Sequence, residues 1–114
     1  MNKKKEYSVH FRIWIDDNNE TFLGAGRINL LEKIIETGSI TNASKELKMN
    51  YRTVWQIIKK INEHAEKPLV INVRGGVGGG GGSVVTDFGK EMMNRYYLIE
   101  NKFKEIIEIH KEQF

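Results

Sequence analysis

The chain contains no cysteine, only one proline and no long uninterrupted apolar run among its 114 residues. Without cysteine it can form neither a disulfide framework nor a thiolate metal site. This suits a reducing compartment, and we therefore expect a cytoplasmic protein. Residues 1–5 are basic, as at the start of a signal peptide, but polar residues interrupt the apolar ones throughout residues 7–15. We therefore expect neither a signal peptide nor a membrane-spanning segment.

Motifs for catalysis and for metal binding are also lacking. His10, His64 and His110 are isolated, with no second ligand at helical or turn spacing, so no zinc site is expected. Residues 16–20 resemble part of a calcium loop but lack its glycine and its distant glutamate. The glycine tract at residues 75–82 is not followed by the Gly-Lys-Ser/Thr of a P-loop. The sequence therefore predicts no enzyme, no metal ion and no cofactor.

Positive charge is unevenly distributed along the chain. Residues 45–84 carry seven basic and three acidic groups, whereas the rest of the chain carries eleven basic and twelve acidic groups. A local basic surface is typical of proteins that bind polyanions, because contacts to phosphates release counterions. With 39% apolar residues, the length suits one domain spanning residues 1–114.

A strand pair is expected within residues 1–24. In residues 7–15 apolar positions alternate with polar ones, which is the period of a half-buried strand. The polar run at 16–20 predicts a turn, and residues 21–23 predict a short returning strand that ends at Gly24 and Gly26.

Three helices are expected within residues 26–67. Apolar residues recur with a helical period from Arg27, and Gly38 predicts the end of the first helix. Its inner face is predicted to hold Ile28, Leu31, Ile34 and Ile35. Ser39 is the expected N-cap of a second helix that ends near Lys48.

The third helix is predicted to begin after Asn50 and to continue to Pro68. Its inner stripe consists of Val54, Ile57, Ile58, Ile61 and Ala65. Trp55 is expected to pack in the core beside the strand pair, as large rings in amphipathic helices generally do. Two short helices joined by a turn of three or four residues, the second with a basic outer face, predict a helix-turn-helix.

Two strands, at residues 69–73 and 83–85, flank seven glycines within residues 75–82. They predict a hairpin, or wing, over residues 69–85, whose bare backbone amides can approach phosphate oxygens. The alternative interpretation of the tract alone is a flexible surface loop.

One long helix is expected over residues 86–113, capped by Thr86 or Asp87. Apolar or histidine positions recur at spacings of 4, 3, 4, 3 and 4, which is a heptad seam. The seam consists of Met92, Tyr96, Ile99, Phe103, Ile106 and His110. It favours pairing with a second chain, with all but His110 as the contact residues. The alternative is a helix that folds back on its own domain.

Three runs carry a family resemblance: GRINLLEKIIETGSITNASKELKMNYRTVWQIIKKIN at residues 26–62, LV at 69–70, and GGVGGGGGSVVTDFGKEMM at 75–93. They resemble the DNA-binding half of ModE-type molybdate-responsive transcription regulators and, more distantly, LysR-type winged helices. The resemblance implies an α+β, mainly α, winged helix-turn-helix with an N-terminal β-hairpin and a long C-terminal dimerisation helix. It also implies a homodimer on a pseudo-palindromic operator in double-stranded DNA. Full-length members add molybdate-binding domains, but this chain stops at Phe114, so molybdate binding is not expected.

The expected DNA contacts combine helix spacing with this resemblance. Arg52 is the candidate for reading guanine and Gln56 for reading adenine, because their side chains can pair with two acceptors or donors in the major groove. Lys59 and Lys60, which follow them on the helix, contact phosphates or remain solvated. The full set is Ser39, Thr41, Asn50, Tyr51, Arg52, Thr53, Gln56, Lys59, Lys60, Arg74, Gly75, Gly76, Gly78, Gly79 and Gly80.

A different class of function stays open at this point. The winged helix can serve as a protein interaction or heterodimerisation module without DNA specificity of its own. A steep fall of DNA affinity with salt, together with a preferred sequence, distinguishes the regulator from this alternative.

Overall fold

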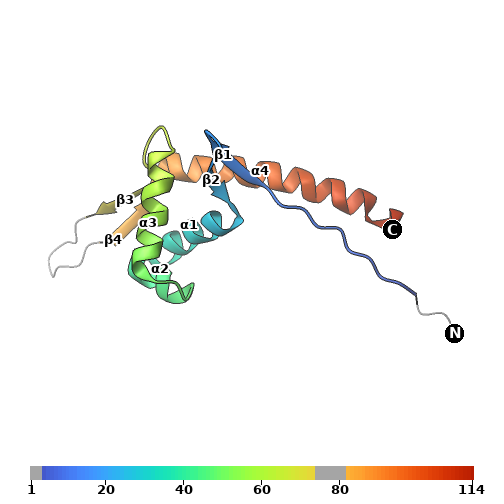
Figure 1. The fold of residues 1–114 in the computed structure, drawn as a ribbon, viewed down its shortest axis with the longest axis horizontal. Helices are drawn as coiled ribbons and strands as arrows, with labels where there is room; N and C mark the ends of the chain where they lie inside the picture. The colour runs from blue at the N-terminus through green and yellow to red at the C-terminus, as the bar shows by residue number, and fades with distance from the viewer. Residues whose placement is uncertain (1–3, 74–81) are drawn as a thin grey trace.

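The fold follows a simple order of strands and helices in the computed structural model, which describes residues 4–73 and 82–114 (Figure 1). The elements are β1 (Trp14–Asp17), β2 (Glu20–Gly24), α1 (Ala25–Thr37), α2 (Ile40–Glu46), α3 (Tyr51–Glu63), β3 (Val70–Val73), β4 (Gly82–Val85), α4 (Asp87–His110) and the 3-10 turn η1 (Lys111–Gln113). The prediction of a mainly α winged helix-turn-helix with an N-terminal hairpin and a long last helix is confirmed. None of the helices built from these residues is long and apolar enough to cross a membrane.

The N-terminal hairpin is shorter than the alternating pattern predicts. β1 pairs antiparallel with β2, and the two-residue turn between them places Asn18 and Asn19 at positive φ, as a type I′ hairpin requires. Residues 4–13, which we call the arm, have no strand partner, so the strand predicted over residues 7–15 is wrong for most of its length. The arm instead extends along the second half of α4, where the rings of Phe11 and Phe103 stack at 5.9 Å between centroids.

Helix caps divide the middle of the chain into its three helices. Gly38 adopts φ +73° and donates its N–H to the Ile34 carbonyl, which ends α1 as predicted. The Ser39 hydroxyl and the Asn50 amide oxygen accept hydrogen bonds from the backbone N–H groups of Asn42 and Arg52, at 2.9 and 2.8 Å, and so begin α2 and α3. These caps leave only a short turn between α2 and α3.

Two details of the helix predictions are wrong. Ile35, assigned to the inner face of α1, is exposed, whereas Leu30 is buried, because α1 is covered on a second side. α3 ends at Glu63 rather than at Pro68, since the chain must turn back there for β3 to lie against the helix.

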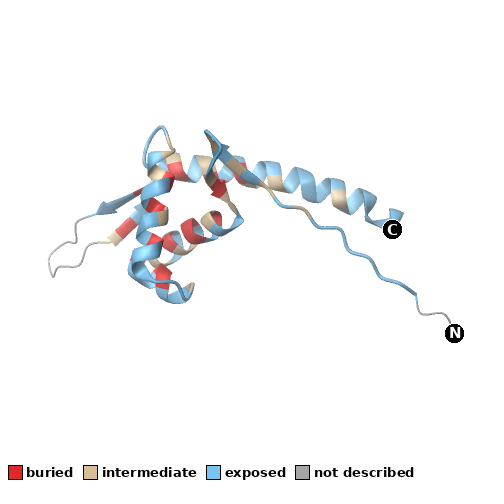
Figure 2. Cartoon of the chain, viewed as in Figure 1, coloured by how far each residue is buried: buried red, intermediate tan, exposed pale blue. Residues whose placement is uncertain are grey.

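The core is one cluster shared by the helices, the wing strands and β2 (Figure 2). Its fully buried side chains include Leu31, Ile34, Ala43, Val54, Ile61 and Leu69. Burying each large aliphatic side chain contributes about 1.5–3 kcal/mol, so this cluster fixes the angle between α3 and the wing.

The two strands of the wing run antiparallel, from the pair Val70 and Val85 to the pair Val73 and Gly82. β4 is attached to the α1–α2 turn, because the Ser83 N–H donates to the Gly38 carbonyl at 3.0 Å. A Cβ at Gly82 would lie 2.7 Å from that carbonyl oxygen, so only glycine allows this approach. The predicted contacts Arg74, Gly75, Gly76, Gly78, Gly79 and Gly80 lie outside the described residues.

The first half of α4 packs on the domain and the second half extends away from it. Thr86 caps the helix, accepting from the Gly89 N–H at 3.0 Å, and also donates to the Pro68 carbonyl at 2.7 Å. Tyr97 donates to Glu32 of α1. Burial, followed by this hydrogen bond, raises the pKa of Tyr97 above its ordinary value. These contacts fix the start of α4 against both α1 and the wing.

Candidate nucleic-acid interface

The outer face of α3 presents a row of exposed polar side chains. Arg52, Thr53, Gln56, Lys59 and Lys60 are all exposed, while the opposite face of the helix is buried. Within residues 4–73 and 82–114, no ion pair involves either of the two lysines or the arginine. Their positive charges are therefore free to meet an external anion.

The start of α3, the start of α2 and the base of the wing meet at one shallow pocket of about 210 Å³. Ser39 and Thr41 come from the start of α2, Tyr51 from α3, and Asn72 and Ser83 from the wing. The fold thus gathers three of the predicted contacts, which are separate in sequence, beside both wing strands. Thr41 and Tyr51 are exposed, and Ser39 is half-buried.

Two of the predicted contacts have a structural role at this surface. The side-chain oxygens of Ser39 and Asn50 accept the capping hydrogen bonds of α2 and α3. Each therefore orients a helix N-terminus, where unpaired backbone N–H groups favour a phosphate.

Asn62, which no sequence pattern singled out, positions the wing relative to α3. Its amide nitrogen donates to the Val70 carbonyl at 3.0 Å, and its amide oxygen accepts from the Leu69 and Val70 N–H groups at 2.9 and 3.3 Å. One side chain thus satisfies three backbone groups at the start of β3. The only signal in the sequence is an amide on the flank of a helix that ends shortly before a strand.

Trp55 is not a core residue, contrary to the prediction. Its side chain is 43% exposed and lies in the angle between α3 and the wing. The pocket there, of about 340 Å³, is also lined by Ile40, Lys59 and Val70. The ring is on the flank of α3, between the buried stripe and the outer face, where helical spacing alone does not decide its exposure.

The predicted dimerisation seam is divided between the two halves of α4. Met92 is half-buried and Tyr96 is only 2% exposed, so both belong to the chain's own core rather than to a surface that a partner can reach. The remaining positions, Ile99, Phe103 and Ile106, are exposed, and so are Leu98 and Ile109. An apolar surface therefore covers much of the second half of α4.

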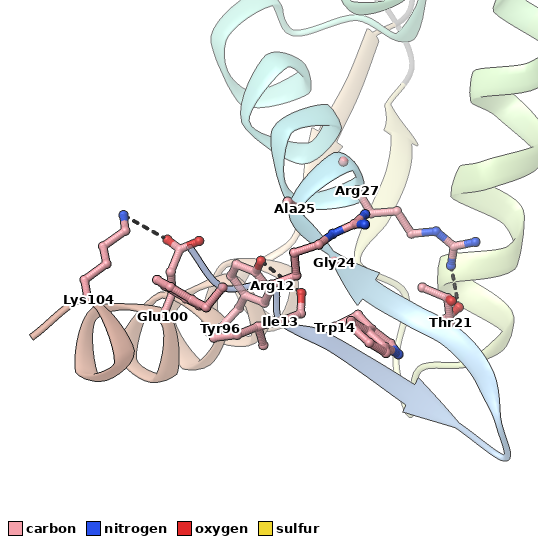
Figure 3. A pocket seen from close by; sticks show the side chains of 12 residues that line it. Arg12, Ile13, Trp14, Thr21, Gly24, Ala25, Arg27, Tyr96, Glu100 and Lys104 are labelled. Atoms are coloured by element: carbon pink, nitrogen blue, oxygen red, sulfur yellow. Dashed lines mark hydrogen bonds and ion pairs between the residues drawn. The ribbon is translucent and has the colours of Figure 1, made fainter. Parts of the chain in front are cut away.

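The arm and the hairpin enclose a hollow of about 660 Å³ with α4 and the start of α1. Figure 3 shows Arg12 and Ile13 beside Tyr96 and Glu100, and Arg27 turned toward the Thr21 carbonyl. The Arg27 guanidinium donates to that carbonyl at 2.6 Å, and burial lowers the pKa of Arg27. The hollow thus adjoins the exposed apolar surface of α4.

Histidines do not assemble a metal site in the part of the chain that the structure describes, where no cluster of three or more His, Asp or Glu residues suits a metal ion. His64 instead bridges the hairpin turn to α3. Its two ring nitrogens lie 2.9 Å from an Asp17 oxygen and 3.0 Å from a Glu20 oxygen. This contact attaches the hairpin to the C-terminal end of α3.

Comparison with known proteins agrees with this geometry. Residues 26–90, from α1 to the start of α4, match the family model of the bacterial regulatory helix-turn-helix proteins of the LysR family. The molybdenum transport protein ModE of Azotobacter vinelandii is 35% identical over 97 residues, which is 85% of this chain and 36% of that protein. The DNA-binding transcriptional dual regulator ModE of Escherichia coli K12 is 36% identical over 78 residues, which is 68% of this chain and 29% of that protein.

A relative with a different name matches over a similar length. The molybdenum-pterin-binding protein MopB of Rhodobacter capsulatus is 36% identical over 78 residues, and these cover 28% of it. The chain therefore spans only 28% to 36% of the length of these three relatives. The resemblance to ModE regulators is confirmed, and the chain belongs to the LysR family of bacterial regulatory helix-turn-helix proteins.

Proposed function

We propose that this chain binds DNA sequence-specifically, as a transcription regulator that recognises a pseudo-palindromic operator as a homodimer. The observation that carries the proposal is the exposed row of Arg52, Gln56 and Lys59 on α3, beside the base of the wing. A helix of this kind fits the major groove, where bidentate side chains distinguish base pairs. The family match and the name of the Escherichia coli relative support the same function.

The side chains of α3 have different roles in DNA recognition. Arg52 pairs with guanine, and Gln56, one turn later on the same face, pairs with adenine. Tyr51 and Thr53 contact phosphates or thymine methyl groups, and Lys59 and Lys60 contact phosphates. Ser39 and Thr41 at the start of α2 add backbone contacts, as does the wing.

The homodimer forms through the second half of α4. Ile99, Phe103 and Ile106 leave apolar area exposed to water, and a second copy can cover it. A contiguous apolar surface of this kind marks an interaction site, and twofold pairing presents α3 twice, as a symmetric operator requires. The arm adds to the interface, because Phe11 already stacks on Phe103 at its edge.

The test is selection of bound fragments from random duplex DNA by the purified protein. We expect a symmetric motif with half-sites about 34–36 Å apart, one turn of the double helix. We also expect the logarithm of the binding constant to fall linearly with the logarithm of the salt concentration. The slope should be about −0.9 for each phosphate contacted. Absence of a preferred sequence and of salt dependence at low salt would instead identify a protein interaction module.

A further inference from the structure

We propose that Trp55 contacts the deoxyribose of the DNA strand that crosses between α3 and the wing. This inference rests on the proposed function and names a contact that neither helix spacing nor family resemblance assigned. Of the two tryptophans in the chain, Trp55 alone lies on α3, and its ring is 43% exposed. A half-exposed indole presents a large apolar face and one N–H donor, which suits contact with a partner surface that is partly apolar and partly polar.

The position of the ring indicates what covers it. The pocket at Trp55 and the pocket at Tyr51 share Ile40 and Asn72, so one shallow trough follows the flank of α3 along the wing. With α3 in the major groove and the wing on the adjacent backbone, the strand between the two grooves passes over this trough. The sugars of that strand therefore face Trp55.

The chemistry of the trough fits a sugar rather than a base or a phosphate. Ile40, Ile58 and Val70 supply an apolar floor, which suits the carbon face of deoxyribose. Lys59 and Glu63 both line the same pocket, and the exposed Lys59 supplies a positive charge for the neighbouring phosphate. The indole ring adds a large, rigid surface that loses little conformational entropy on contact.

A single-tryptophan variant reports on this contact directly. Trp14→Phe leaves Trp55 as the only indole, and Trp14 lies in β1, away from the trough. Titration of this variant with the selected duplex should change the Trp55 emission and saturate at one dimer per duplex. Unchanged emission at saturating duplex overturns the proposal.

Affinity measurements separate a sugar contact from base reading. Trp55→Ala should weaken binding by about tenfold, equally for selected and random duplexes, and should leave the salt slope unchanged. Trp55→Phe should recover most of the loss. Duplexes with uracil in place of thymine should bind with unchanged affinity. A loss of affinity as large as that caused by Trp55→Ala would identify a thymine methyl contact and overturn the sugar assignment.

Two further results distinguish the possible failures. Thermal unfolding of Trp55→Ala, followed by circular dichroism, should still show one cooperative transition well above the temperature of the binding assay, because the ring is not one of the buried core residues. If Trp55→Ala is folded and binds with unchanged affinity, the inference falls while the proposed function stands. If the unmodified chain itself binds no duplex, the proposed function and this inference both fall.

Discussion

Gly89 allows α4 to start directly against the wing. A Cβ at this position would lie 2.6 Å from the Leu69 carbonyl oxygen and 2.7 Å from a methyl group of Val85. The Thr86 cap, which binds the Gly89 N–H, depends on the same approach. The spacing Thr86-x-x-Gly89 thus has a steric cause.

Replacement of Gly89 by alanine should destabilise the chain. We expect Gly89→Ala to lower the free energy of unfolding by about 1–3 kcal/mol, since the new methyl group forces the backbone of β3 or α4 to shift. Urea unfolding followed by circular dichroism measures the change. Gly26→Ala is the matched control, because a Cβ there meets nothing within 4 Å. This substitution should raise the free energy of unfolding by at most about 1 kcal/mol. Equal effects of the two substitutions would contradict the steric explanation.

Arg52 and Lys59 should differ in how their loss affects DNA binding. Arg52→Ala should cost about 1–3 kcal/mol on the preferred operator and relax selectivity at one base pair. Lys59→Ala should weaken binding to all DNA sequences alike and should reduce the slope of affinity against salt concentration by about one. Both side chains are exposed, so neither change should alter folding. Binding of Arg52→Ala with unchanged affinity and selectivity would show that the recognition assignment is wrong.

Single hydrogen-bonding groups, in addition to the shared core, link the elements of the candidate recognition surface. Asn62 connects α3 to β3, the Gly38 carbonyl connects the α1–α2 turn to β4, and His64 connects α3 to the hairpin turn. Each of these contacts attaches a strand that is only four or five residues long. The orientation of the wing therefore depends on a few identifiable hydrogen bonds as well as on the core.

Loss of the Asn62 side chain should loosen the wing more than α3 itself. Asn62→Ala leaves the N–H of Leu69, a fully buried residue, without its acceptor, and we expect a loss of about 1–3 kcal/mol in the free energy of unfolding. Hydrogen exchange should increase first at Leu69 and Val70. Asn94→Ala, at an exposed position on α4, is the control and should be neutral. Unchanged exchange at the two wing residues would mean that the core alone holds β3.

Periodicity predicted the helices and the wing strands well, but it could not predict which faces have partners. The alternation in residues 7–15 is that of a strand, yet no strand lies beside most of it. Trp55 occupies a helix flank that spacing leaves undecided, and Leu30 is buried because α1 is covered on two sides. These features depend on tertiary packing. Asn62 likewise has a role only because β3 returns to within hydrogen-bond distance.

At the scale of the whole molecule, α4 and the arm extend away from the core on the side opposite the wing (Figure 1). The apolar side chains on the second half of α4 remain exposed, and 72% of Ile109 is accessible to water. The seam pattern predicted pairing along the whole helix, but the first part of α4 is packed in the chain's own core through Tyr96. Only the second half is free for a partner.

Charge placed on this apolar surface should dissociate the proposed dimer without unfolding the chain. Ile106→Glu should raise the dimer dissociation constant by about 100-fold or more, because pairing would bury an unpaired carboxylate. Sedimentation equilibrium measures the change. Asn101→Glu adds the same charge on the polar side of α4 and should leave the dimer intact. A monomeric unmodified chain, or equal effects of the two substitutions, would rule out this interface.

The hydrogen bonds of Asn62 also bear on how the wing resists self-association. A two-stranded sheet leaves unpaired backbone groups on both outer edges, and such edges recruit further strands. At the base of this wing one edge is occupied by the Asn62 amide, and the Ser83 N–H on β4 is bound by the Gly38 carbonyl. α3 and the α1–α2 turn thus block strand addition there, so the wing can remain a hairpin of two strands without seeding aggregates.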